Sequence, residues 1–66
     1  MIPSRELRAL NEEIEKGETR MGEVRRHIEM LKEMNVETVP AERTLKALTD
    51  AQAERLAKKA ALENSN

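Results

Sequence analysis

Few side chains in this 66-residue chain could carry chemistry, and His27 comes first because it is the only histidine. Glu23 precedes His27 by one helical turn, a spacing that could chelate a metal ion on a helix surface. Two ligands are too few for a zinc site, although a dimer could bring two such pairs together. The alternative is an exposed histidine that contacts Glu23 across one turn. We expect no metal site and no cofactor.

The hydroxyl groups and the carboxylates form no catalytic pattern. No serine or threonine has a base or an orienting carboxylate at a suitable spacing, and the chain has no cysteine to act as a thiol nucleophile. Several carboxylates could cluster, namely Glu12, Glu13, Glu29 and Glu33. A di-metal site in a helix bundle, however, needs Glu and His side chains that face inward, and the predicted apolar seam has neither. The sequence therefore predicts no catalytic residues and a protein that is not an enzyme.

Two adjacent basic pairs, Arg25-Arg26 and Lys58-Lys59, are the features that could bind nucleic acid. Nucleic-acid binding favours a basic stripe, whereas here 12 basic and 13 acidic residues are interleaved and leave a net charge of −1. The chain also has no aromatic residue on which a base could stack. A nucleic-acid accessory protein that uses both pairs across a dimer is the alternative function, and we consider it the weaker one.

The pattern that must position all of these residues is a heptad repeat, which predicts a helix over about 5–34 with Ser4 as its N-cap. Successive seam positions lie three or four residues apart if Gly17 is counted as one of them. The apolar residues at the other positions are Leu7, Leu10, Ile14, Met21, Val24, Ile28 and Leu31. Gly17 lies on this seam, where it indicates either a kink or close approach of two helices, or simply a tolerated weak spot. Gly22 lies beside the seam and allows the same interpretations.

A turn over about 35–39 separates this helix from a second one over about 40–62. Asn35 suits the left-handed residue that ends a helix, Thr38 can cap the next one, and Pro40 fits its first turn. Val39 should stay outside the helix because it precedes proline. Residues 63–66 form a polar tail that we expect to fray.

Leu45, Leu48 and Leu56 carry the seam of the second helix, which we expect to be continuous although Thr49 could begin a new helix. Gln52 occupies a position where an apolar residue would be expected. A connection this short makes the helices antiparallel neighbours. Alignment about the turn then places Ile28 against Leu45, and Gly17 against Leu56.

One such hairpin buries a single stripe per helix, too little for a stable monomer without aromatic residues, a metal ion or disulfides. The fold class predicted is therefore all-α, an antiparallel two-helix, coiled-coil-like hairpin, completed by dimerisation as a four-helix bundle. Leu7 and Leu10 extend beyond the apolar part of the second helix and should need a partner. A monomeric hairpin and a parallel or extended coiled coil are the alternatives. The predicted self-association seam consists of Leu7, Leu10, Ile14, Met21, Val24, Ile28, Leu31, Leu45, Leu48 and Leu56.

The stretch from Lys16 to about Ala57 resembles short uncharacterised helical-hairpin proteins of rhizobia and other α-proteobacteria. The residues that carry this resemblance are Gly17, Glu18, Ile28, Leu31, Thr38, Ala41, Leu45, Leu48 and Gln52. Asn35 and Pro40 depart from the family pattern, which more often has Gly and a polar residue there. The resemblance implies a helical hairpin from a bacterium and carries over no functional residues.

Together these features predict a small non-enzymatic coiled-coil protein that self-associates and mediates protein–protein interaction. We expect a homodimer, with a further protein partner that the sequence does not name. The chain has no apolar run long enough to cross a bilayer and no apolar signal segment at its start. We therefore expect a cytoplasmic protein that does not bind membranes.

Overall fold

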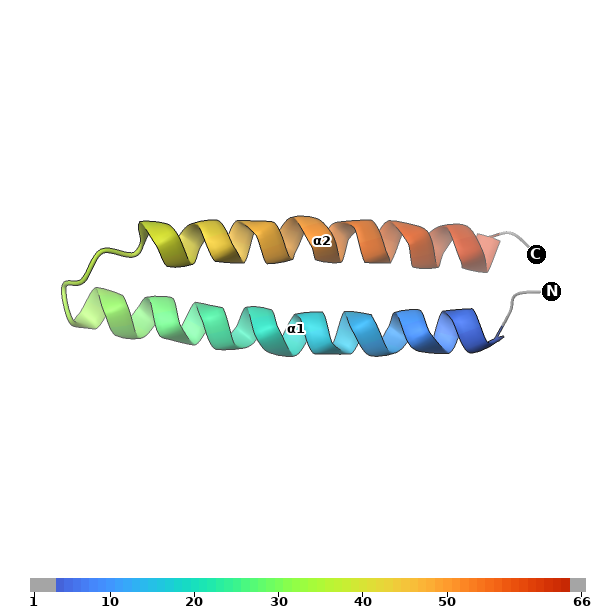
Figure 1. Cartoon of the computed structure of the whole chain (residues 1–66), viewed down its shortest axis with the longest axis horizontal. Helices are drawn as coiled ribbons and strands as arrows, with labels where there is room; N and C mark the ends of the chain where they lie inside the picture. The colour runs from blue at the N-terminus through green and yellow to red at the C-terminus, as the bar shows by residue number, and fades with distance from the viewer. Residues whose placement is uncertain (1–3, 65–66) are drawn as a thin grey trace.

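The computed structural model describes residues 4–64, which form two antiparallel helices joined by a short turn (Figure 1). Helix α1 spans Ser4–Glu33 and helix α2 spans Val39–Asn64. The end of α1 away from the turn lies beside the end of α2, so that the hairpin measures 52 × 15 × 11 Å. Residues 4–64 contain no strand, which confirms the predicted all-α hairpin. The capping role predicted for the Ser4 side chain lies outside the described part of the chain.

The end of α1 is a Schellman motif built on Asn35. Asn35 has φ of 58°, in the left-handed region that asparagine tolerates better than most residues. Its N–H donates to the carbonyl of Lys32 at 3.1 Å, and the N–H of Val36 donates to the carbonyl of Leu31 at 2.9 Å. These two bonds satisfy carbonyl groups that the helix leaves without a partner. The predicted role of Asn35 is confirmed.

Helix α2 begins one residue earlier than the sequence predicts, because Val39 is helical. The carbonyl of Thr38 accepts the first helical hydrogen bond from the N–H of Glu42 at 2.8 Å, which requires Val39 and Pro40 to lie in the first turn. The bias against helical geometry before proline is therefore outweighed here. The Thr38 hydroxyl donates to the Glu42 carboxylate at 3.1 Å and adds a second link across that turn.

Helix α2 then continues without a break, as expected. The Thr49 hydroxyl donates to the Leu45 carbonyl one turn before it at 2.8 Å, instead of capping a new helix. The helix also extends past Leu62, so Glu63 and Asn64 belong to α2. Residues 65–66 of the predicted tail lie outside the described residues.

The core of the hairpin comes mainly from α1. Its buried apolar side chains are Leu10, Met21, Val24 and Ile28, whereas the predicted seam residues Leu7, Ile14, Leu31, Leu45 and Leu48 are half-buried. Leu56 is 47% exposed. Among the residues described, no side chain reaches complete burial. One hairpin therefore forms a thin core, and the buried apolar side chains that make it up come from α1 and not from α2.

Leu10 differs from the prediction that it needs a second chain. It is only 6% exposed within a single hairpin, because α2 reaches far enough to place Lys58 and Leu62 around the same surface groove. Helix α2 is longer than predicted, and the apolar stem of the Lys58 side chain can cover Leu10 as an apolar residue would. A count of the apolar residues of α2 leaves out both contributions.

Candidate functional site

The most buried side chain in the described hairpin is polar. Gln52 of α2 is 3% exposed and lies against α1, where its amide Nε2 donates to the carbonyl of Ile14 at 2.8 Å and to Glu18 Oε1 at 3.0 Å. Arg55 Nη1 donates to Gln52 Oε1 at 3.0 Å. Each polar atom of this amide is thus paired, as burial requires. We name Gly17, Glu18, Gln52 and Arg55 the polar layer.

Gly17 makes room for the polar layer. A methyl group added at Gly17 would collide first with Gln52 Oε1, and would also lie 2.9 Å from Arg55 Nη1. Without a side chain at this position, the Gln52 amide can reach the backbone of the adjacent turn of α1. Of the interpretations left open for Gly17, these contacts favour a close approach of the two helices over a tolerated weak spot.

The predicted pairing of Gly17 with Leu56 is wrong by one turn of α2. Gln52 occupies that place because its amide can bond to the Ile14 carbonyl, which an aliphatic side chain cannot do. Leu56 is displaced to the side and becomes half exposed. The signal that could have found this arrangement was present in the sequence, since Gly17 and Gln52 both interrupt an otherwise apolar seam.

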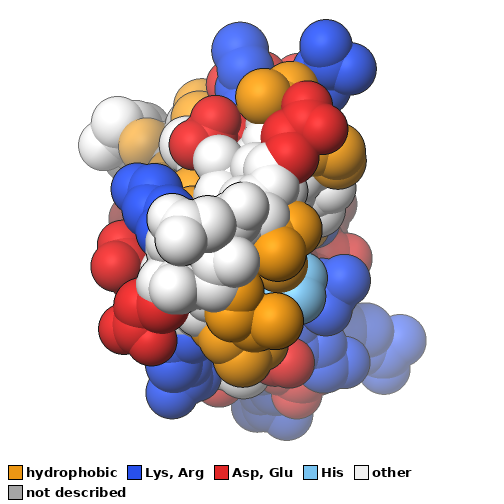
Figure 2. All heavy atoms as spheres, turned by 90° about the vertical axis from the view of Figure 1, so that its left-hand side faces the viewer, with side chains coloured by type: hydrophobic (Ala, Val, Ile, Leu, Met, Phe, Trp, Pro, Cys, Tyr) orange, Lys and Arg blue, Asp and Glu red, His pale blue; other side chains and the backbone are white. Residues whose placement is uncertain are grey.

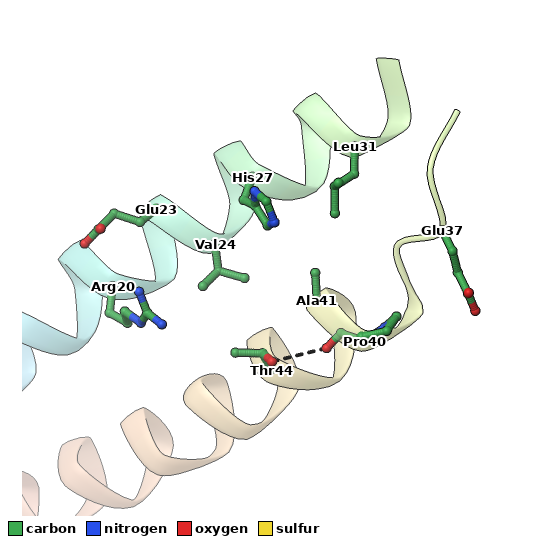
Figure 3. A pocket seen from close by; sticks show the side chains of 9 residues that line it. All are labelled: Arg20, Glu23, Val24, His27, Leu31, Glu37, Pro40, Ala41 and Thr44. Atoms are coloured by element: carbon green, nitrogen blue, oxygen red, sulfur yellow. Dashed lines mark hydrogen bonds between the residues drawn. The ribbon is translucent and has the colours of Figure 1, made fainter. Parts of the chain in front are cut away.

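His27 lies at a groove near the turn that has a volume of about 370 Å³ (Figure 3). Arg20, Val24 and Leu31 of α1 line it together with Ala41 and Thr44 of α2. Glu23 also lines the groove, but no group of three or more possible metal ligands occurs among the described residues. The hydroxyl of Thr44 donates to the Pro40 carbonyl at 3.1 Å, so that it is engaged within its own helix.

The two basic pairs lie in different halves of the hairpin. Arg25 and Arg26 border a groove near the turn beside Glu29 and Glu42. Lys58 lies in the opposite half, beside Glu13. About 15 residues of helix, or roughly 22 Å, separate the two pairs along the axis. A single hairpin does not join them into one basic surface, and the nucleic-acid alternative stays a prediction that would need a dimer.

Large apolar side chains are exposed at the turn end. We name this set the turn-end cluster, and its members with their exposed fractions are Met30 at 49%, Met34 at 63%, Val36 at 45% and Val39 at 42%. Figure 2 looks onto this end of the molecule and shows hydrophobic side chains beside the histidine, with charged side chains around them. Methionine is flexible and polarizable, which suits it to protein-binding surfaces.

Comparison with protein-family models, curated proteins and solved structures finds no match to this chain. The resemblance to α-proteobacterial hairpin proteins stays a prediction. Neither α1 nor α2 is long and apolar enough to span a membrane. The functional argument therefore depends on the surfaces of the hairpin themselves.

Proposed function

We propose that this chain is a small non-enzymatic coiled-coil protein of the bacterial cytoplasm, which self-associates into a four-helix bundle and binds a further protein. The observation that carries the proposal is the incomplete core. Only four apolar side chains are buried in the described hairpin, while five of the ten predicted seam residues are half-buried and Leu56 is exposed. Two helices of this length become stable when a second pair covers their remaining apolar surface.

Sedimentation equilibrium over a concentration series tests self-association. The chain lacks Trp and Tyr, so interference optics must follow it. We expect a mass of twice the 7.5 kDa of the chain at high concentration, falling towards the single-chain mass on dilution. A mass of 7.5 kDa at every concentration would contradict the proposal.

The turn-end cluster is the surface that we assign to the further protein partner. Its four side chains lie at one end of the rod, where a dimer packed along the length of the hairpin leaves them free. Affinity purification from the native host, with the parent chain and with Met34→Glu compared side by side, tests this assignment. We expect a protein that the parent retains and the variant loses. Equal recovery with both would remove the turn end from the partner interface.

A further inference from the structure

We infer that the second copy of this chain docks on one particular broad face of the hairpin, the face that carries Leu7, Ile14, Leu45 and Leu56. We name it the Leu56 face. The inference rests on the proposed self-association and specifies the surface responsible for it. Two other surfaces compete for this role, the turn-end cluster and the opposite broad face with its His27 groove.

Helical spacing places the four residues on one face. On α1, Leu7, Ile14 and Ile28 are separated by multiples of seven residues, and on α2, Leu45 and Leu56 are three turns apart. Ile28 and Leu45 line the same groove, which joins the two rows across the hairpin. Leu7, Ile14 and Leu45 are half-buried and Leu56 is exposed, so each retains apolar surface that a partner can cover.

The dimensions of the hairpin favour a broad face over the turn end. A broad face measures 52 by 15 Å, or about 780 Å², which approaches the roughly 800 Å² that each partner contributes to a standard interface. The turn end measures 15 by 11 Å, or about 165 Å², and is too small to hold a dimer together by itself. A second copy therefore fits along the rod.

Charge distinguishes the two broad faces along α2. On the Leu56 face, α2 presents a run of uncharged side chains, which are Thr49, Ala53, Leu56 and Ala60. On α1 the same face carries Glu18, whose carboxylate already accepts a hydrogen bond from Gln52, and also Arg8 and Glu15, which line a groove with Leu7. On the opposite broad face, the same stretch of α2 carries Glu54, Arg55 and Lys58. Burial of those three charged side chains would cost more than burial of the uncharged stretch of α2 on the Leu56 face.

The Leu56 face also has the charge pattern of a two-fold interface. Glu18 and Arg25 are both exposed and lie seven residues apart on α1, with Gly22 between them. A methyl group at Gly22 would meet only Arg26 Nη2 at 4.0 Å, so the surface there is open. An antiparallel copy centred near Gly22 would place each Glu18 opposite the partner's Arg25, and a two-fold axis would repeat that pair.

Two variants with matched exposure test the face by sedimentation equilibrium of the full chain. Leu56→Glu adds a charge to the Leu56 face, and Met30→Glu adds the same charge at a site of similar exposure, 49% against 47%. Both sites are helical and open to solvent in the single hairpin. We expect Leu56→Glu to raise the dimer dissociation constant at least about tenfold, because a two-fold interface counts the change twice. Met30→Glu should change it less than about twofold.

The outcomes separate this inference from the proposed function. If the parent is monomeric at every concentration, the proposed self-association fails and the inference fails with it. If the parent dimerises and Leu56→Glu dimerises equally well, the Leu56 face is wrong while self-association stands. A larger loss with Met30→Glu would move the interface to the turn end and overturn the inference in the same way.

Cysteine accessibility decides the question if Leu56→Glu unfolds the hairpin. The chain has no cysteine, so Ala60→Cys and Ala61→Cys each introduce a single thiol at an exposed site. Residue 60 lies one turn after Leu56 on the same face, whereas residue 61 is turned away by about 100°. We expect maleimide to react more slowly with Ala60→Cys as dimer forms, and with Ala61→Cys at an unchanged rate. Equal concentration dependence at both sites would overturn the inference.

Discussion

Replacement of Gly17 by alanine tests the polar layer directly, because two opposing effects meet at that residue. Alanine is a better helix former than glycine and should stabilise α1 by about 1 kcal/mol. The added methyl group, however, would collide with Gln52 Oε1 and crowd Arg55. Relief requires the Gln52 amide to move away from the Ile14 carbonyl and from Glu18, which breaks its bonds of 2.8 and 3.0 Å.

The second effect should dominate. A buried polar group left without its partners costs about 1–3 kcal/mol, and the Gln52 amide has three such bonds to lose. After the gain in helix propensity, we expect Gly17→Ala to lower the free energy of unfolding by up to about 2 kcal/mol. For a domain of this size, each kcal/mol lost lowers Tm by roughly 4–8 °C.

Gly22→Ala is the matched control, because its methyl group would enter open space. We expect it to raise the free energy of unfolding by up to about 1 kcal/mol. Circular dichroism at 222 nm, with thermal and urea unfolding at one fixed chain concentration, measures both variants. Equal stabilisation by both alanines would refute the reasoning about Gly17.

A double variant identifies the cause of the expected loss. In a Gln52→Ala background the main collision partner is absent, and the Arg55 side chain, which has lost its bond to Gln52, is free to move away from the added methyl group. Gly17→Ala should then become stabilising, as Gly22→Ala is in the parent. The difference between the two backgrounds gives the coupling between Gly17 and Gln52. If Gly17→Ala is equally destabilising in both backgrounds, the cost arises from something other than Gln52.

Two further predictions concern burial and the turn. Ile28→Asp places an unpaired charge at a site that is 6% exposed and should cost more than about 4 kcal/mol, enough to abolish the cooperative helical melt. Leu31→Asp should cost less because Leu31 is half-buried, and equal losses of helicity by circular dichroism would contradict the burial order. Asn35→Val should destabilise by about 1–2 kcal/mol because φ of 58° is unfavourable for a β-branched residue. Asn35→Gly should retain or slightly raise Tm, and a loss with glycine would show that the Asn35 side chain itself is needed.

Local signals in the sequence predicted much of the fold. The heptad spacing of α1, the left-handed Asn35 and the start of α2 near Thr38 each depend on residues close in sequence, so that their effects can be read without knowledge of the partner helix. The same locality explains the error at Val39. The restriction before proline is a local preference, and Val39 is helical in spite of it, in a first turn that the bond from Glu42 to the Thr38 carbonyl closes.

The register of the two helices and the state of each seam residue were decided by tertiary structure. Leu56 and Gln52 are one helical turn apart on α2. Alignment of the two helices about the loop that joins them is not accurate enough to tell which of the two lies against Gly17. The outcome follows from the fit of an amide into the gap beside Gly17 and from its bond to the Ile14 carbonyl. That choice buried a polar residue and exposed Leu56, because rotation of a packed helix moves one side chain outward as it moves another inward.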